Sequence, residues 1–123
     1  MKKVLVFGVF DLFHFGHLRL LRSASKLGDY CIVAVQSDEY ITKFKPANSV
    51  GTLYSLSERM EMVRALRCVD EVVPYDEVAS DIVNIEFDIY VRGPDNTHEG
   101  IKTAIKWCEA NGKEVITDRK SVV

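Results

Sequence analysis

The stretch VLVFGVFDLFHFGHLRLL, residues 4–21, decides the fold of this chain. Residues 4–8 form a continuous apolar run, which is typical of a strand that is covered on both faces of a parallel sheet. Beyond the loop 9–15, small and branched apolar residues recur on one helical face: Leu20, Leu21, Ala24 and Leu27. Gly28 is the predicted stop of this helix. The stretch therefore predicts a strand, a loop and a helix that begins near Gly16 or His17.

The rest of the chain repeats this alternation. Four further apolar runs predict strands at residues 30–35, 71–74, 87–91 and 114–117. Ser55 and Glu58 form a capping-box pattern that opens a second helix. A weaker helix is expected near 77–85, and a last helix near 98–111, capped by Thr97 and stopped by Gly112. Alternating strands and helices predict an α/β fold with right-handed crossovers.

Composition narrows the class of protein. The 123 residues suit one domain, and 47% apolar with 28% charged residues is an ordinary globular composition. The net charge of -2 argues against a nucleic-acid binder. Three widely spaced cysteines without a CxxC motif suit reduced thiols in a cytoplasmic protein. We expect no secretory signal in the short apolar N-terminus and no membrane span, because no run approaches ~20 apolar residues.

The loop after the first strand is the expected ligand site. Ligands of open α/β sheets bind at the carboxyl edge of the strands, where helix N-termini attract phosphate. Gly8 would let the backbone approach a ligand, and Gly16 would let the chain turn into the helix. His14 and His17 would then both face the phosphates, and the anionic charge would favour their cationic form. Two imidazolium donors there would stabilise a phosphoryl group during its transfer.

Two other interpretations of the histidines stay open at this point, a purely structural role and a zinc site. Both rings could be satisfied by backbone carbonyls, or they could bind zinc, although no third ligand is evident nearby. The segment KFKPANSVGTLY, residues 43–54, is long for a connection in so small a domain, which is often a functional feature. It could equally be a plain connector.

The segment GVFDLFHFGH, residues 8–17, resembles the HxGH signature of the cytidylyltransferase-like nucleotidyltransferases. Further segments make the glycerol-3-phosphate cytidylyltransferases the nearest group: LGDY at 27–30, SDE at 37–39 and VDEVVPY at 69–75. The resemblance implies a single Rossmann-like three-layer domain over residues 1–123, with a parallel five-stranded sheet. It also implies a homodimer.

The resemblance implies a reaction as well. A phosphate oxygen of a small phosphorylated alcohol, with glycerol 3-phosphate as the prototype, would attack the α-phosphorus of CTP and release pyrophosphate. The nucleophile is already an anion, so positioning and charge stabilisation would suffice. Mg²⁺ would accompany the triphosphate. The implied catalytic residues are His14, His17, Lys43, Lys45 and Arg119, the implied nucleotide-binding residues are Gly8, Val9, Phe10, Asp11, Gly16, Arg59, Gly93 and Asp95, and Asp38 would face the acceptor.

Several of these residues also have ordinary structural interpretations. Asp11 could cap its turn. Lys43 and Lys45 could be solvated charges, and Arg59 could be an exposed helix residue. Asp38 could serve the turn after Ser37.

Three departures from the family pattern leave the substrates open. Val9 replaces a hydroxyl residue. In RGPDNTHEG, residues 92–100, Gly93 and Asp95 match the turn beside the base, but Pro94 and Asn96 do not. The chain ends in DRKSVV, where a Ser/Thr pair should follow Arg119, so we expect that the last motif residues are missing or divergent. The alternatives are an adenylyltransferase of the same superfamily, of the heptose-phosphate or flavin-nucleotide type, and a non-catalytic nucleotide-binding module.

Overall fold

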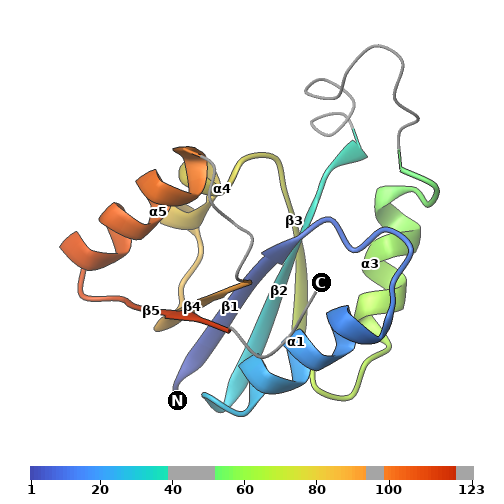
Figure 1. The fold of residues 1–123 in the computed structure, drawn as a ribbon, viewed down its shortest axis with the longest axis horizontal. Coiled ribbons are helices and arrows are strands. Elements are labelled where there is room, and N and C mark those ends of the chain that lie inside the picture. Colours follow the sequence, from blue (N-terminus) through green and yellow to red (C-terminus); the bar gives the residue numbers. More distant parts are fainter. Residues whose placement is uncertain (39–51, 94–98, 119–123) are drawn as a thin grey trace.

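The computed structural model describes residues 1–38, 52–93 and 99–118. Five parallel strands form one sheet in the order β3-β2-β1-β4-β5 (Figure 1). The strands are β1 (Lys3–Gly8), β2 (Tyr30–Gln36), β3 (Glu71–Tyr75), β4 (Ile89–Arg92) and β5 (Glu114–Thr117). The predicted α/β class with a parallel five-stranded sheet is confirmed.

The strand β1 is the centre of the sheet. It pairs with β2 from Lys3↔Tyr30 to Gly8↔Val35 on one side, and with β4 at Val4↔Ile89 and Leu5↔Tyr90 on the other. The chain runs outward from β1 to β3 and then returns to the other side of β1. The strand order therefore changes direction between β1 and β4, and ligands of open α/β sheets bind at such a point.

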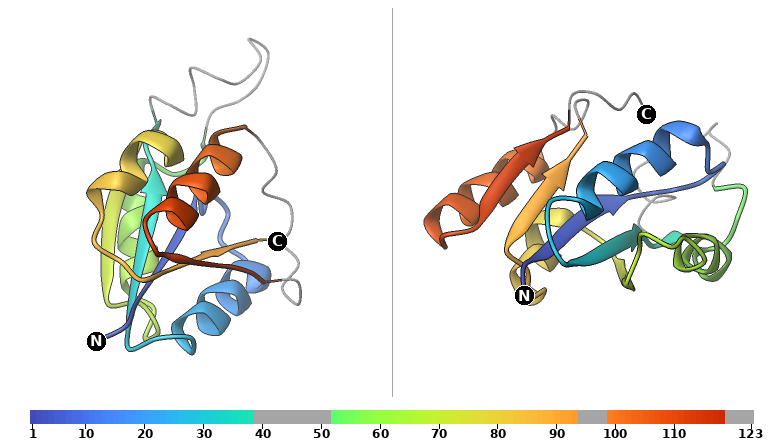
Figure 2. Two further views of the ribbon diagram at one scale, coloured as in Figure 1. Left: turned by 90° about the vertical axis from the view of Figure 1, so that its left-hand side faces the viewer. Right: turned by 90° about the horizontal axis from the view of Figure 1, so that it is seen from below.

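Helices cover both faces, as Figure 2 shows for α1 (Phe15–Ser25) and α5 (Glu99–Ala110) on opposite sides of the sheet. Alternate β1 side chains enter the two cores. Val4 and Val6 pack with α1 and with α3 (Leu56–Arg64). Leu5 and Phe7 pack under α4 (Val78–Asp81), the 3-10 turn η1 (Ile82–Asn84) and α5. This two-sided burial explains the continuous apolar run of β1.

The predicted elements differ from the observed ones mainly at their ends. The fourth strand begins at Ile89 and not at residue 87; Phe87 is buried just before it. The weak helix near 77–85 consists of the short α4 followed by η1. The capping box of Ser55 and Glu58 is present at the start of α3. Thr97, the predicted cap of the last helix, lies outside the described residues.

Gly28 is not the helix stop that the sequence suggested. The helix α1 ends at Ser25 with Lys26 as its C-cap. A Cβ on Gly28 would lie 2.6 Å from Val4 Cγ2 and 2.7 Å from the Lys2 carbonyl oxygen, so this glycine allows close packing against the start of β1. Gly112, by contrast, follows α5 with φ 71°, a conformation that favours glycine, as expected of a helix end.

No helix in the described parts of the chain has the length and apolar character needed to cross a membrane.

Candidate active site

The loop between β1 and α1 holds an unusual backbone conformation. Phe10 and Leu12 have backbone φ values of 55° and 48°, which lie in the left-handed region that residues other than glycine rarely adopt. Burial of Phe10, which is 3% exposed within the core under α1 and α3, compensates for this strain. The Phe10 ring lies over Gly8, where a Cβ would meet Phe10 Cε2 at 2.6 Å. Gly8 thus makes room for a core side chain. Its predicted approach to a ligand stays a prediction.

His14 and His17 cap the first turn of α1 reciprocally. The Gly16 N–H donates to His14 Nδ1 at 3.0 Å, and the His14 N–H donates to His17 Nδ1 at 3.1 Å. The two ring centroids are 3.9 Å apart. The rings are therefore bonded to backbone N–H groups, not to backbone carbonyls. An Nδ1 atom that accepts a hydrogen bond carries no proton, so each neutral ring is protonated at Nε2.

His17 is neutral at pH 7 in this structure. Burial beside Phe10 and Phe13, followed by the charge of His14, lowers the pKa of His17 from 6.5 to about 4. The expected imidazolium at His17 concerns the ring beside bound phosphate, so it stays a prediction; in the ligand-free protein this ring is neutral. Within the described residues, no hydrogen bond engages Nε2 of either ring. Because both Nδ1 atoms accept hydrogen bonds, the pair offers two Nε2–H donors at the N-terminus of α1, where the dipole also favours an anion.

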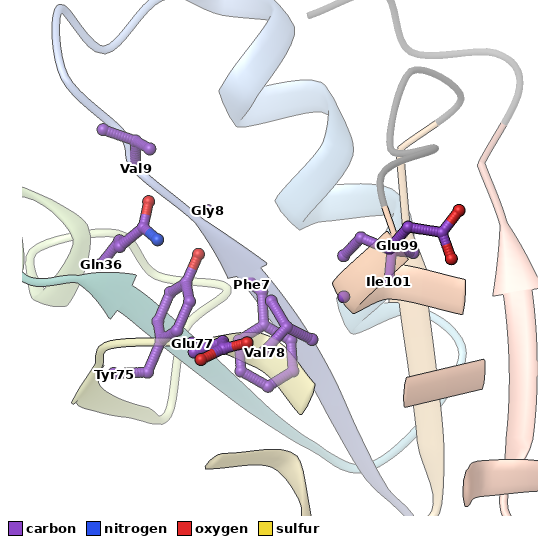
Figure 3. A pocket seen from close by; sticks show the side chains of 10 residues that line it. Phe7, Gly8, Val9, Gln36, Tyr75, Glu77, Val78, Glu99 and Ile101 are labelled. Atoms are coloured by element: carbon purple, nitrogen blue, oxygen red, sulfur yellow. The ribbon is translucent and has the colours of Figure 1, made fainter. Parts of the chain in front are cut away.

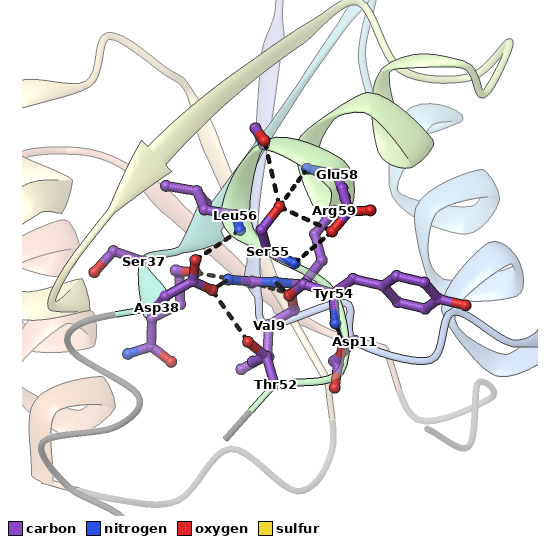
Figure 4. A network of polar contacts seen from close by, with 12 residues as sticks. Val9, Asp11, Ser37, Asp38, Thr52, Tyr54, Ser55, Leu56, Glu58 and Arg59 are labelled. Carbon is purple, nitrogen blue, oxygen red and sulfur yellow. Dashed lines mark hydrogen bonds and ion pairs between the residues drawn. The ribbon is translucent and has the colours of Figure 1, made fainter. Parts of the chain in front are cut away.

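Arg59 is a buried residue that links several segments, and it is not the exposed helix residue that the sequence also allowed. It is 0% exposed. Its guanidinium donates to three carbonyl oxygens and pairs with Asp38 (Figure 4): Tyr54 O at 3.0 Å, Val9 O at 2.8 Å and Gln36 O at 2.8 Å. These partners belong to three segments: the β1–α1 loop, the end of β2 and the approach to α3. Arg59 therefore fixes the loop that leads to the histidines.

Asp38 is held by the same network. It accepts hydrogen bonds from the Leu56 N–H at 2.9 Å and from Thr52 Oγ1 at 3.1 Å, in addition to Arg59. Burial alone would raise the pKa of Asp38, but the Leu56 N–H and Arg59 outweigh it, so that the pKa lies below its usual value. The carboxylate is ionised and anchors the N-terminus of α3. Its role toward an acceptor stays a prediction.

Asp11 links the loop to a distant segment. Its carboxylate accepts the Leu53 N–H at 2.8 Å and the Tyr54 N–H at 3.0 Å. The two partners lie more than forty residues along the chain, so Asp11 does more than cap its own turn. Asp11 and Arg59 together hold the β1–α1 loop against the chain that precedes α3.

A cavity of about 410 Å³ opens beside this loop, at the carboxyl ends of β1, β2 and β3 (Figure 3). Val9 and Gly8 lie on the loop side, and the start of α5 lies opposite. The lining residues are Phe7, Gly8, Val9, Gln36, Tyr75, Glu77, Val78, Glu99, Gly100 and Ile101. It lies at the edge where the topology predicts a ligand.

The remaining predicted residues fall at this edge or outside the described chain. Gly93 is buried directly after β4. Lys43, Lys45, Asp95 and Arg119 lie outside the described residues. Sequence reasoning missed Arg92, the last residue of β4, whose Nε donates to Thr117 Oγ1 of β5 at 2.9 Å. The signal available in the sequence was a positively charged residue at the end of a predicted strand, on the edge of the sheet where ligands bind.

A resident metal site is not evident in the part of the chain that the structure describes. No group there of three or more histidine, cysteine, aspartate or glutamate side chains could hold a metal ion. The two histidines use their Nδ1 atoms for the helix cap.

The sequence of this chain is similar to a family model and to several named proteins. Residues 5–123 match the family model described as "Cytidylyltransferase-like". The chain is 39% identical over 99 residues to the glycerol-3-phosphate cytidylyltransferase of Bacillus subtilis strain 168, covering 77% of this chain and 73% of that protein. It is 42% identical over 118 residues to the bifunctional protein HldE of Pectobacterium atrosepticum, covering 93% of this chain but 24% of that one. It is 34% identical over 113 residues to the ethanolamine-phosphate cytidylyltransferase of Mus musculus, covering 83% of this chain and 27% of that one.

Solved structures share the fold. The lipopolysaccharide core biosynthesis protein of Thermoplasma volcanium GSS1 superposes with a TM-score of 0.81 at 23% identity, covering 98% of both chains. A protein with unknown function from Archaeoglobus fulgidus gives a TM-score of 0.71 at 24% identity, covering 97% of this chain and 90% of that one.

Proposed function

Because the chain belongs to the cytidylyltransferase-like family of nucleotidyltransferases, we propose that it transfers CMP from CTP to a small phosphorylated alcohol such as glycerol 3-phosphate. Pyrophosphate is the second product. The similarity to the glycerol-3-phosphate cytidylyltransferase of Bacillus subtilis strain 168 supports this choice of substrates.

The His14–His17 pair is the observation that carries the proposal. An oxygen of the acceptor phosphate attacks the α-phosphorus of CTP, and the bond from that phosphorus to the pyrophosphate oxygen breaks. Negative charge grows on the oxygens around the reacting phosphorus, and the two Nε2–H groups donate to it. The neutral imidazole of His17 suits this task, since a ring that has no charge to lose can still polarise an oxygen. The N-terminus of α1 adds to the same field.

Mg²⁺ enters this scheme with the nucleotide. Phosphate oxygens and water are ligands that Mg²⁺ prefers, so the ion would be held by the triphosphate without a dedicated protein site. When bound, it neutralises part of the phosphate charge. The lysines at 43 and 45 and Arg119 are proposed to share this role. They lie outside the described residues.

A substrate screen tests the proposal. The protein is mixed with Mg²⁺, one triphosphate and one phosphorylated alcohol, and pyrophosphate is measured. We expect release with CTP and glycerol 3-phosphate, and far less with ATP. Release with ATP alone would favour an adenylyltransferase instead.

An adenylyltransferase of the same superfamily is the second candidate, because Pro94 and Asn96 depart from the sequence pattern of the cytidylyltransferases. The turn at residues 93–96 would decide between the bases. A non-catalytic nucleotide-binding module is the third candidate, and it predicts CTP binding without pyrophosphate release for any acceptor. We also propose a homodimer, which light scattering of the purified protein checks directly.

A further inference from the structure

The charge of the cavity beside the β1–α1 loop suggests how the acceptor is chosen. We propose that Glu77 and Glu99 make this cavity accept phosphorylated compounds whose far end carries hydroxyl or ammonium groups, and reject those whose far end is a carboxylate or a second phosphate. This inference rests on the proposed function, because it assumes that the molecule in the cavity is the acceptor of the transfer.

The position of the cavity follows from the geometry of the transfer. The acceptor phosphate must reach the α-phosphorus beside the loop that ends in His14 and His17. The remainder of the acceptor then extends into adjoining space. The cavity shares Gly8 and Val9 with this loop, and its volume of about 410 Å³ suits a small molecule.

The lining carries negative charge and no positive charge among its described members. Glu77 and Glu99 lie on its rim, Gln36 contributes an amide, and Phe7 and Tyr75 form an aromatic wall with ring centroids 4.8 Å apart. Carboxylates accept hydrogen bonds from hydroxyl and ammonium groups. An anionic group there would lose hydration and gain repulsion, which disfavours the wrong partner.

Glu77 is the stronger determinant of the two. It stands at the N-cap position of α4, but its side chain makes no cap hydrogen bond. The carboxylate of Asp81 binds the start of α4 instead, since its Oδ2 accepts hydrogen bonds from the N–H groups of Asp76 at 2.7 Å and Glu77 at 3.1 Å. The Glu77 carboxylate is therefore not used by the described fold. Glu99 has a partner in Lys102, 3.4 Å away, but both side chains are exposed and such a pair is weak.

Three aspartates near the ends of β2 and β3, which are Asp38, Asp76 and Asp81, do not line the cavity and cannot substitute for these glutamates. Asp38 accepts from Arg59, Leu56 and Thr52. Asp81 holds the start of α4 as described above. Asp76 Oδ1 accepts a hydrogen bond from Ser37 Oγ. All three aspartates are engaged in the fold, so among the described residues the carboxylates left to face an acceptor are those of Glu77 and Glu99.

Three acceptors that differ in their far end test this inference. Glycerol 3-phosphate presents hydroxyls, phosphoethanolamine an ammonium, and 3-phosphoglycerate a carboxylate. We measure kcat/KM for each at saturating CTP, and Kd for each by calorimetry. The wild-type protein should disfavour 3-phosphoglycerate by about tenfold or more in both measurements. The first two acceptors show whether hydroxyl or ammonium groups are preferred.

Charge reversal then assigns the effect to residues. Glu77→Lys should improve 3-phosphoglycerate relative to glycerol 3-phosphate by about tenfold, equivalent to ~1.4 kcal/mol, without changing the KM for CTP. Glu99→Gln should give a smaller change in the same direction. Glu86→Lys is the matched control, because Glu86 is exposed and does not line the cavity, and it should leave the ratio unchanged.

The outcomes separate this inference from the proposed function. Absence of pyrophosphate with every acceptor contradicts the proposed function, while the Kd values still test the charge selection. Equal preference of the wild-type protein for the three acceptors, or equal effects of Glu77→Lys and Glu86→Lys on the Kd ratio, would overturn the inference.

Discussion

At the scale of single residues, the proton on His17 decides how the site handles charge. The folded state lowers the pKa of His17 to about 4, whereas the unfolded chain has the ordinary value of 6.5. The unfolded chain therefore binds the proton more tightly, and the free energy of unfolding should fall as the pH drops from 6.5 toward 4. Protonation at Nδ1 would also break the bond from the His14 N–H.

The pH dependence of turnover follows from the same pKa. We expect kcat/KM to stay level through neutral pH with respect to His17 and to decline as the pH approaches 4. Nuclear magnetic resonance of the ring in the ligand-free protein gives the pKa directly. A His17 ring that titrates at 6.5 or above would refute the neutral state.

Arg59 is the residue whose loss should matter most to the loop. Arg59→Met would leave the carbonyl oxygens of Val9, Gln36 and Tyr54 and the charge of Asp38 without their donor. We expect the free energy of unfolding in urea to fall by about 3 kcal/mol or more. Arg64→Met, at an exposed position of the same helix, should change it by less than ~0.5 kcal/mol. Similar small losses in the free energy of unfolding for both variants would contradict the role of Arg59 as a buried link between segments.

At the scale of elements, the β1–α1 loop depends on Gly8 and Phe10 as a pair. Gly8→Ala would place a methyl group 2.6 Å from the Phe10 ring, which is packed in the core. We expect a loss of about 1–3 kcal/mol in the free energy of unfolding and a fall in turnover, because the loop must shift. Gly112→Ala is the control. It meets only the backbone strain of φ 71°, since no atom lies within 4 Å, and it should leave turnover unchanged.

If Gly8→Ala matched Gly112→Ala in turnover, the close fit of Gly8 and Phe10 would have no bearing on the site. The comparison thus separates a local loss of stability from displacement of the loop.

The strands and helices were largely predictable from the sequence, whereas the strained loop and the burial of Arg59 were not. Apolar runs and the Ser55–Glu58 cap predicted the described strands and helices to within a few residues, because burial on two faces and a capping box are local signals. The predicted stop at Gly28 was wrong. The strain at Phe10 and Leu12 has no such signal, since either residue is ordinary in a strand or helix. The burial of Arg59 was hidden for the same reason: its partners lie as far as fifty residues away.

At the scale of the whole molecule, the sheet order brings the site together. The change of direction between β1 and β4 places the histidine loop, the cavity and Gly93 on one edge. The sequence predicted this edge through the alternation of strands and helices. It could not predict the protonation of His17, because desolvation depends on how Phe10 and Phe13 pack around the ring.

The most direct test of the account is the rate of the chemical step in His17→Ala. Wild-type and variant protein are saturated with Mg²⁺-CTP and glycerol 3-phosphate, and pyrophosphate is followed in a single turnover, with CTP affinity measured separately. Loss of one donor to the transition state should slow the step by ~10²–10³-fold and change CTP affinity far less. An unchanged rate in this variant would contradict the claim that the paired imidazoles stabilise the transferring phosphoryl group.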